Sequence, residues 1–213
     1  MEDSTSALTG NESESIFTEN KHRTILSVSE NLNTVISYLE CLSEYGSDYA
    51  IRKAIEEGSL FRVGRGLYSR SPTPGFLAIE MARHPDAIVC LDSAFFYHGL
   101  TDMVPDSLHL ATSRSAKRIS DPAVCQHFVP QAILRIGETT MERNGAKLRI
   151  YDLERAAIDV IRMRPRLPYD LCKEVILSLR ARSRDMYPAR IADYLEHFPR
   201  RDSILDAIEK EIF

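Results

Sequence analysis

The chain has 213 residues, of which 44% are hydrophobic and 27% are charged, a balance typical of a globular protein with one large or two small domains. Its net charge of -4 argues against a protein that coats nucleic acid without specificity, because such proteins depend on many phosphate contacts. No apolar run approaches the roughly 20 residues of a membrane-spanning helix. The first ten residues lack a basic segment followed by an apolar one, so we expect a cytoplasmic protein without membrane contact.

The charges are unevenly distributed along the chain. Residues 1–20 contain five acidic and no basic side chains, and residues 71–110 contain five acidic and one basic. Residues 21–70 contain seven basic side chains against six acidic, and residues 111–150 contain seven against three. Two mildly basic segments separated by an acidic one fit a small, site-specific nucleic-acid-binding module that works as a dimer.

The N-terminal part combines a polar segment with a helical pattern. Residues 1–24 are rich in Ser, Thr, Glu and Asn and are expected to form an acidic flexible tail. Helical spacing of apolar residues then predicts a helix from Asn31 or Asn33 to Tyr45. The apolar residues of this helix are Val35, Ile36, Leu39 and Leu42. An earlier short helix or strand around residues 25–28 remains an open alternative.

A second, shorter helix is predicted to begin at Ser47, whose hydroxyl can accept a hydrogen bond from a backbone N–H of the first turn. Its apolar residues recur at helical spacing and form one buried face; they are Ala50, Ile51, Ala54 and Ile55. Gly58 follows the last turn, where a left-handed residue commonly ends a helix.

A β-hairpin is predicted directly after this helix. Residues 60–63 and 67–69 are expected to be strands, joined by the turn Gly64-Arg65-Gly66. A short helix followed by a hairpin with a basic tip predicts the second half of a winged helix-turn-helix, within a DNA-binding domain of residues 25–70. In that arrangement the helix enters the major groove and the tip of the hairpin lies on the phosphates.

The residues expected to contact DNA lie outside the apolar face of the helix or at the hairpin. They are Ser47, Tyr49, Arg52, Lys53, Arg62 and Arg65. Tyr49 or Arg52 is placed to contact base edges, and the hairpin residues are placed to contact phosphates.

Residues 71–75 contain two prolines and predict a stiff linker to a second domain, residues 76–213. The predicted elements of this domain are a helix at 76–83, a strand at 87–91, a helix from Asp92 or Ser93 to Gly99, strands at 107–111 and 132–136, a hairpin of 139–143 with 146–151, and helices at 152–162, 170–182, 188–198 and 202–212. Asn144-Gly145 is a strong pattern for a hairpin turn. Strands followed by helices predict an α+β domain.

No catalytic, metal or cofactor site is predicted. The chain contains no GxGxxG, Walker, HExxH or GxSxG motif. The four cysteines are widely spaced, which favours reduced thiols over a disulfide framework or a zinc site; they are Cys41, Cys90, Cys125 and Cys172. The protein is therefore expected not to be an enzyme.

Several polar clusters have two interpretations. Arg114, Lys117 and Arg118 lie in a Ser-rich loop that could bind a phosphate or an acidic partner, or could simply be solvated. Asp152 and Glu154 at a helix start are interpreted as capping residues in preference to a catalytic pair.

Two further groups are interpreted as features of helix ends. His98 is interpreted as a helix-end residue in preference to a ligand. Arg162, Arg164 and Arg166 are interpreted as a solvated, charged helix end.

Four segments carry a resemblance to a known family, in the family's order and spacing across about Asn31 to Arg182. They are Gly58–Tyr68 with its RGLY end, Leu91–Leu100 with its SAFFYHGL run, His109–Thr112, and Tyr151–Asp159 with its YDLERAAID run. The chain resembles the AbiEi-type antitoxins, the DNA-binding partners in type IV toxin–antitoxin and phage-abortive systems. It departs from the family pattern at Ala156, where the family often has Thr.

The resemblance implies an N-terminal winged-helix domain that represses its own operon by binding an inverted repeat in the promoter. It also implies a C-terminal antitoxin domain that neutralises a nucleotidyltransferase-like toxin. An alternative is a protein-interaction module that neutralises a partner without binding DNA. A third, less favoured, hypothesis is a nuclease or transferase that uses Asp92, Asp152, Glu154 and Asp159.

Overall fold

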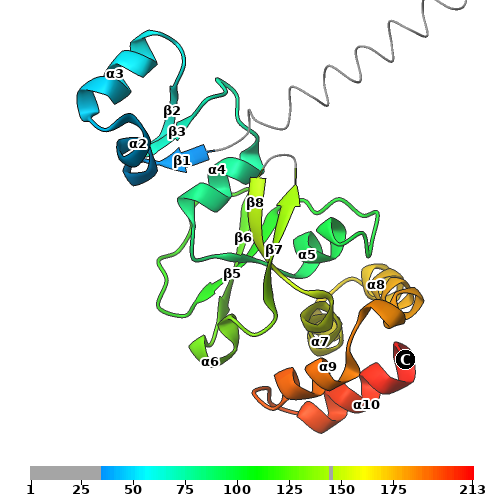
Figure 1. Ribbon diagram of the computed structural model, residues 1–213. Coiled ribbons are helices and arrows are strands. Elements are labelled where there is room, and N and C mark those ends of the chain that lie inside the picture. Colours follow the sequence, from blue (N-terminus) through cyan, green and yellow to red (C-terminus); the bar gives the residue numbers. More distant parts are fainter. Residues whose placement is uncertain (1–34, 144–145) are drawn as a thin grey trace, which may run out of the picture. The chain divides into compact units, whose positions relative to one another are not determined.

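The computed structural model describes residues 35–143 and 146–213 (Figure 1). The expected tail at 1–24, the start of the first predicted helix and the Asn144-Gly145 turn lie outside the described residues. Within them, a three-stranded sheet, a five-stranded sheet and several C-terminal helices confirm the α+β class. None of the described helices is both long and apolar enough to cross a membrane.

The chain divides into two compact units. The first contains the described residues up to Arg83 together with Arg143 and Ala146, and the second contains His84–Glu142 and Lys147–Phe213. The linker at 71–75 stays a prediction.

The first unit combines three short strands with three helices. In chain order these are β1 (Val35–Ser37), α2 (Tyr38–Tyr45), α3 (Asp48–Glu56), β2 (Phe61–Gly64), β3 (Leu67–Ser69) and α4 (Phe76–Arg83). Strand β3 lies between β1 and β2 and is antiparallel to both. The core of the unit consists of Cys41, Ile51, Ala54, Leu60 and Tyr68.

The prediction of one helix up to Tyr45 is wrong at its described beginning, because Val35–Ser37 is a strand and the helix starts at Tyr38. Ser37 and Glu40 form a capping box: the Ser37 hydroxyl accepts from the Glu40 N–H at 3.3 Å, and the Glu40 carboxylate accepts from the Ser37 N–H at 2.7 Å. This pair starts a helix at Tyr38, while the β-branched residues before it pair with β3.

The rest of the first unit agrees with the predicted elements. Ser47 caps α3, with its hydroxyl accepting from the Ala50 N–H at 3.2 Å. Gly58 has a left-handed φ of 71°. The hairpin β2–β3 and the helix at 76–83 are present as predicted.

The second unit is built on a mixed sheet whose strand order is β6-β5-β4-β8-β7. Its elements are β4 (Ile88–Val89), α5 (Leu91–Tyr97), β5 (Leu108–Ser113), β6 (Val124–Val129), α6 (Gln131–Leu134), β7 (Glu138–Arg143), β8 (Ala146–Tyr151), α7 (Leu153–Met163), η1 (Arg164–Arg166), α8 (Tyr169–Ala181), η2 (Ser183–Asp185), α9 (Pro188–Leu195) and α10 (Arg201–Glu211). Strand β4 is antiparallel to β5 and parallel to β8, and β5 is parallel to β6. The last four α-helices are present as predicted, and α8, α9 and α10 gather around α7 (Figure 1).

The predicted strand at 132–136 is wrong, and the strand β6 was not predicted. Residues 131–134 form the short helix α6, in which the consecutive residues Ile133 and Leu134 are both buried. A strand would direct two consecutive side chains to opposite faces. Strand β6 contains polar residues at 126 and 127, which interrupt the apolar pattern that identifies a buried strand.

The predicted cap of the 91–97 helix is also wrong. Helix α5 begins at Leu91, and the residue before it, Cys90, makes no side-chain capping bond. The Ser93 hydroxyl instead accepts from the His109 N–H at 2.9 Å and donates to the Ser107 carbonyl at 3.3 Å, so it attaches α5 to β5.

Gly137 is a position where the fold requires glycine. Its φ is +76°, and a Cβ placed on it would lie 2.5 Å from the Arg155 Cβ and 3.0 Å from an Asp152 carboxylate oxygen. We expect Gly137→Ala to lower the free energy of unfolding by roughly 2–5 kcal/mol, the sum of left-handed backbone strain and overpacking. Urea denaturation measures the change.

Gly99→Ala is the matched control for this prediction. Gly99 also has a left-handed φ, +66°, but no atom lies within 4 Å of its added Cβ. We expect about 1–2 kcal/mol of destabilisation there from the backbone alone. Equal losses at the two glycines would contradict the close approach described for Gly137.

Candidate functional site

Helix α3 exposes the residues that were predicted to contact DNA. Tyr49 is 74% exposed, and Arg52 and Lys53 are also exposed, while Ile51 and Ala54 are buried in the core. The Arg52 Nε donates to the Asp48 carbonyl at 3.4 Å, and the Lys53 Nζ lies 3.7 Å from a Glu57 carboxylate oxygen. Such contacts between exposed groups contribute little stability, so both cations are available to a ligand.

The β2–β3 turn exposes the other two predicted cations. The Arg62 Nε donates weakly to the Gly64 carbonyl at 3.5 Å. Arg65 is exposed, and no hydrogen bond or ion pair joins it to another described residue. The strand register shifts between Arg62 and Gly64, which bends the hairpin near its tip.

Tyr38 connects the hairpin to both helices, a role that the sequence did not reveal. Its N–H donates to the Gly66 carbonyl at 2.8 Å, which fixes the turn beside the start of α2. Its hydroxyl donates to an Asp48 carboxylate oxygen at 2.8 Å, which fixes the start of α3. This hydrogen bond is the main reason that the pKa of Tyr38 is raised. Helix α3 and the hairpin tip are therefore held in a defined relation.

Residues 35–83 of the first unit carry no charge excess. Residues 35–83 contain six basic and six acidic side chains. Three of the acidic residues, Asp48, Glu56 and Glu57, belong to α3 or its C-terminal cap. A DNA-binding surface here has to rely on the position of a few cations instead of on a strong field.

The three predicted cations of the second unit are exposed after β5. Arg114, Lys117 and Arg118 point to solvent, while the backbone of their loop is attached to β6 through Gln126. The Gln126 amide donates to the Lys117 carbonyl at 3.0 Å and accepts from the Ile119 N–H at 2.8 Å. The loop is thus held by its backbone, and its cations remain open to an anionic ligand.

Three of the four carboxylates of the enzyme hypothesis are engaged in structural contacts. Asp152 caps α7, accepting from the Arg155 N–H at 2.8 Å, as predicted. Glu154 is not a cap: it is buried, and it accepts from the Tyr187 N–H at 3.1 Å and from Arg190 at 3.3 Å. Asp159 pairs with two arginines of its own helix. Each carboxylate therefore has a different structural partner.

His98 lies at the end of α5, as predicted, and it also has a long-range contact. Its Nε2 lies 2.6 Å from the Tyr151 carbonyl oxygen. The Arg182 guanidinium donates to the His98 carbonyl at 2.7 Å. Burial lowers the pKa of His98, so its ring is neutral at pH 7 and can donate an N–H to the carbonyl.

Arg155 is a fully buried cation that the sequence did not identify. Its Nη1 donates to the carbonyls of Ile133 and Ile136 at 2.8 and 2.7 Å, and its Nε lies 3.2 Å from a carboxylate oxygen of Asp159, which is 3% exposed. Its guanidinium carbon lies 4.0 Å from the centre of the Tyr151 ring and 4.8 Å from that of Phe198. Burial disfavours the charged guanidinium, but Asp159 and Tyr151 outweigh this effect and leave the pKa of Arg155 raised.

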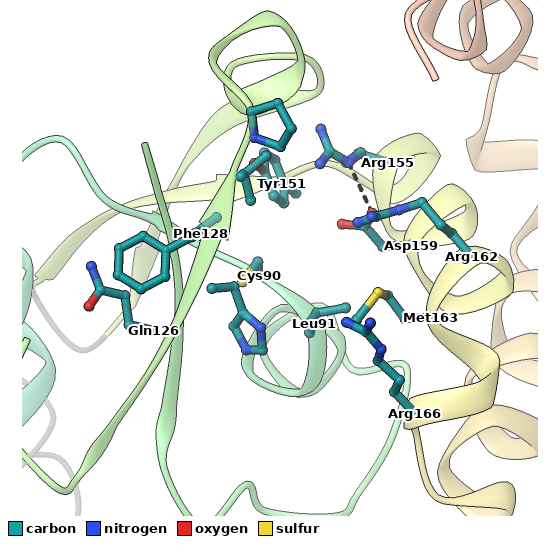
Figure 2. Close-up of a pocket in the computed structure, with 14 residues that line it drawn as sticks. Cys90, Leu91, Gln126, Phe128, Tyr151, Arg155, Asp159, Arg162, Met163 and Arg166 are labelled. Atoms are coloured by element: carbon teal, nitrogen blue, oxygen red, sulfur yellow. Dashed lines mark hydrogen bonds and ion pairs between the residues drawn. The ribbon is translucent and has the colours of Figure 1, made fainter. Parts of the chain in front are cut away.

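A hollow of about 240 Å³ opens beside this ion pair. Figure 2 shows Arg155 and Asp159 joined at one side of it, with Arg162, Met163 and Arg166 along the same side. The interpretation of residues 162, 164 and 166 as a solvated group is wrong in part. Arg162 is 31% exposed and binds Asp159 at 2.8 Å, whereas Arg164 forms a surface pair with Glu211.

The stability of the second unit should depend on pH through Asp152. Burial raises its pKa above 3.8, although hydrogen bonds from the Arg155 N–H and the Tyr194 hydroxyl lower it. A folded-state pKa above the unfolded one gives stability that is complete below the unfolded pKa and is lost as the pH rises through the folded pKa. Asp152→Asn keeps a capping oxygen, so between about pH 4 and pH 7 its unfolding free energy should rise relative to wild type.

Urea denaturation of both proteins across this range measures that difference. Glu196→Gln, a change at an exposed carboxylate just after α9, is the control and should show no such trend. The difference in unfolding free energy between Asp152→Asn and wild type should rise with pH. A difference that stays constant or falls would contradict the raised pKa of Asp152.

A group of potential metal ligands was missed because His109 lies 16 residues before Cys125 and meets it only through the pairing of β5 with β6. His109, Cys125 and His127 each direct a ligand atom to a common point, with all these atoms within 4.8 Å of one another. Burial lowers the pKa of both histidines, so both are neutral at pH 7.

Comparison of the chain with models of known protein families and with curated proteins finds no match.

Proposed function

We propose that the protein is a non-enzymatic transcriptional repressor and antitoxin of the AbiEi type, and that its first unit is a winged helix-turn-helix. The observation that carries the proposal is the set of exposed cations on α3 and the β2–β3 turn, two elements that Tyr38 holds together. The order β1-α2-α3-β2-β3, with β3 at the centre of the sheet, also supports it, since a winged helix contains a helix pair followed by a hairpin.

In the proposed complex, α3 enters the major groove. Tyr49 and Arg52 then contact base edges, because they are exposed on the face opposite the core. Lys53, Arg62 and Arg65 contact phosphates and set the register. The Ser47 hydroxyl is engaged by the helix cap, so Ser47 acts through the N-terminus of α3, where unpaired N–H groups favour a phosphate.

Because the first unit carries so little net positive charge, we expect it to bind DNA as a dimer on a two-fold site. A single copy offers few phosphate contacts, and each lost contact weakens binding. Two copies on an inverted repeat double the contacts and combine the affinities of the half-sites. The second unit then serves as the antitoxin part, whose partner is a nucleotidyltransferase-like toxin; the family resemblance of Leu91–Leu100 and Tyr151–Asp159 supports this role.

Fluorescence anisotropy with the full-length protein tests the proposal. The probe is the DNA upstream of the protein's own gene, compared with a scrambled duplex of the same composition. We expect binding to the upstream DNA to be roughly 10³-fold or more tighter than to the scrambled duplex, and to weaken with salt. Equal affinity for the two duplexes would contradict site-specific repression.

A second candidate function is neutralisation of a partner without DNA binding. The equal numbers of acidic and basic residues in 35–83 favour it. The full chain with Arg52→Ala, Arg62→Ala and Arg65→Ala distinguishes the two functions in a toxicity-rescue assay with the neighbouring gene. Rescue by this variant, together with no DNA binding by wild type, would favour the second candidate.

A further inference from the structure

Strands β5 and β6 bring together two histidines and a cysteine on one face of the second sheet. The two strands are parallel, with His109 opposite Cys125 and Ala111 opposite His127. Residues two apart on a strand point to the same face, so His127 lies on the same face as Cys125. Opposed residues share a face as well, which adds His109 to the group.

The distances between the ligand atoms fit the edges of a tetrahedral metal site. The His127 Nε2 lies 3.3 Å from the His109 Nδ1 and 3.5 Å from the Cys125 Sγ. Bonds of about 2.0–2.1 Å from Zn²⁺ to nitrogen and 2.3 Å to sulfur place two nitrogen ligands roughly 3.3 Å apart, and a nitrogen and a sulfur roughly 3.6 Å apart. These two distances therefore match tetrahedral edges, and the three ligand atoms together lie within 4.8 Å of one another.

Asp92, in the first turn of α5, is a candidate fourth ligand that has to move toward the ion, because its carboxylate is not among the atoms that lie within 4.8 Å of one another. Its Oδ1 lies 3.8 Å from the His109 Nδ1. This oxygen is buried, and no described residue donates a hydrogen bond to it. An acceptor that is shielded from water without a donor is destabilising, and a cation at this point removes the penalty.

We propose that Asp92, His109, Cys125 and His127 form a structural Zn²⁺ site. Two neutral imidazoles, a thiolate and a carboxylate balance the charge of the ion. Nitrogen and thiolate donors in a tetrahedron favour Zn²⁺ over Mg²⁺ or Ca²⁺, which prefer six or more oxygen ligands. With Asp92 moved into the fourth position, no position is left open for a reacting water, so the proposed site is structural and not catalytic.

The proposed role of the ion is to fasten the edge of the sheet. Strand β6 is the last strand on its side, where the sheet order begins β6-β5-β4. The ion would join β6 to β5 through three ligands and join both strands to α5 through Asp92. It would also hold β6 beside the hollow of Figure 2, to which Gln126 and His127 contribute.

Cobalt titration of the metal-stripped full-length protein tests the site. We expect one Co²⁺ per chain, a thiolate-to-cobalt charge-transfer band, intense visible bands typical of tetrahedral Co²⁺, and displacement by one equivalent of Zn²⁺. Cys125→Ser should abolish the charge-transfer band. His127→Gln should weaken Zn²⁺ binding at least about 100-fold, since loss of an outer-shell partner alone costs 10–100-fold.

Thermal unfolding gives a second, independent measurement. Zn²⁺ at about 100 times its dissociation constant should raise the melting temperature of wild type by roughly 5–10 °C. His197→Ala removes an exposed histidine outside the site and should bind Co²⁺ and Zn²⁺ as wild type does.

Two results would overturn the proposal. One is the absence of saturable Co²⁺ binding by wild type, which would mean that the three side chains only share hydrogen bonds. The other is a wild-type Co²⁺ complex that lacks the thiolate-to-cobalt band and whose spectrum is the same for Cys125→Ser. The first result needs only wild type, and circular dichroism of Cys125→Ser confirms that the variant is folded before its spectrum is compared.

Discussion

Replacing Arg155 with alanine is expected to lower the free energy of unfolding by about 3–5 kcal/mol, the range for breaking a buried ion pair. The substitution leaves the carbonyls of Ile133 and Ile136 without their buried donor. It also opens a cavity between the rings of Tyr151 and Phe198, which the guanidinium now contacts. Most domains have only about 5–15 kcal/mol of stability, so this variant should be close to unfolding.

Arg162→Ala is the matched control, because Arg162 binds the same carboxylate as Arg155. The Arg162 Nη2 lies 2.8 Å from the Asp159 Oδ1, but its side chain is 31% exposed and reaches solvent. We expect a loss of about 0–1 kcal/mol, as for other partly exposed ion pairs. Urea denaturation of both variants makes the comparison. Similar losses of unfolding free energy would show that Arg155 contributes no more to stability than a partly exposed ion pair does.

The second large effect is expected on DNA binding, where each substitution acts twice if the proposed symmetric dimer forms. Arg62→Ala with Arg65→Ala removes up to four phosphate contacts per dimer. The slope of log affinity against log salt should then become less steep by about 3–4, and the loss should be similar on all DNA sequences. Arg52→Ala should instead cost roughly 2–6 kcal/mol on the preferred site and relax specificity, because each base contact is worth about 1–3 kcal/mol.

Anisotropy titrations over a range of salt concentrations separate these two effects. Arg200→Ala with Arg201→Ala is the control, since both are exposed arginines at the start of α10 and outside the proposed interface. This control should keep the wild-type slope and affinity. If it lost as much affinity as the hairpin variant, binding would depend on net charge and not on the β2–β3 turn.

The elements that the sequence predicted correctly are those specified by residues close to them in the chain. Ser47 predicted the start of α3, and the apolar residues at 50, 51 and 54 predicted its buried face. The hairpin β2–β3 and the C-terminal helices followed from turn residues and 3.6-residue periodicity in the same way. Each of these signals lies within about ten residues of the element it specifies.

Elements that depend on distant partners were not predictable in this way. Strand β1 is extended because it pairs with β3, more than 30 residues later along the chain. Strand β6 is a strand because it pairs with β5, although its polar residues conceal the pattern. The His109–His127 contact depends on that register, so the spacing of the histidines in the sequence could not reveal it.

The burial of Arg155 also depends on partners that are distant in the sequence. The run YDLERAAID predicted a helix start and the Asp152 cap, but nothing in the run identified its arginine as buried. Arg155 is buried because the carbonyls it binds are contributed by α6 and the segment after it, about 20 residues earlier in the chain. A buried arginine needs such partners, and only the fold brings them together.

Hydroxyl-radical footprinting of the full-length protein on the DNA upstream of its own gene tests the proposed repressor function most directly. The proposal predicts two protected segments related by a two-fold axis, with centres about one helical turn, or a whole number of turns, apart. Arg52→Ala should lose this protection at concentrations where wild type shows it. Absence of protection by wild type at saturating concentration, or uniform protection along the whole duplex, would contradict site-specific binding through α3.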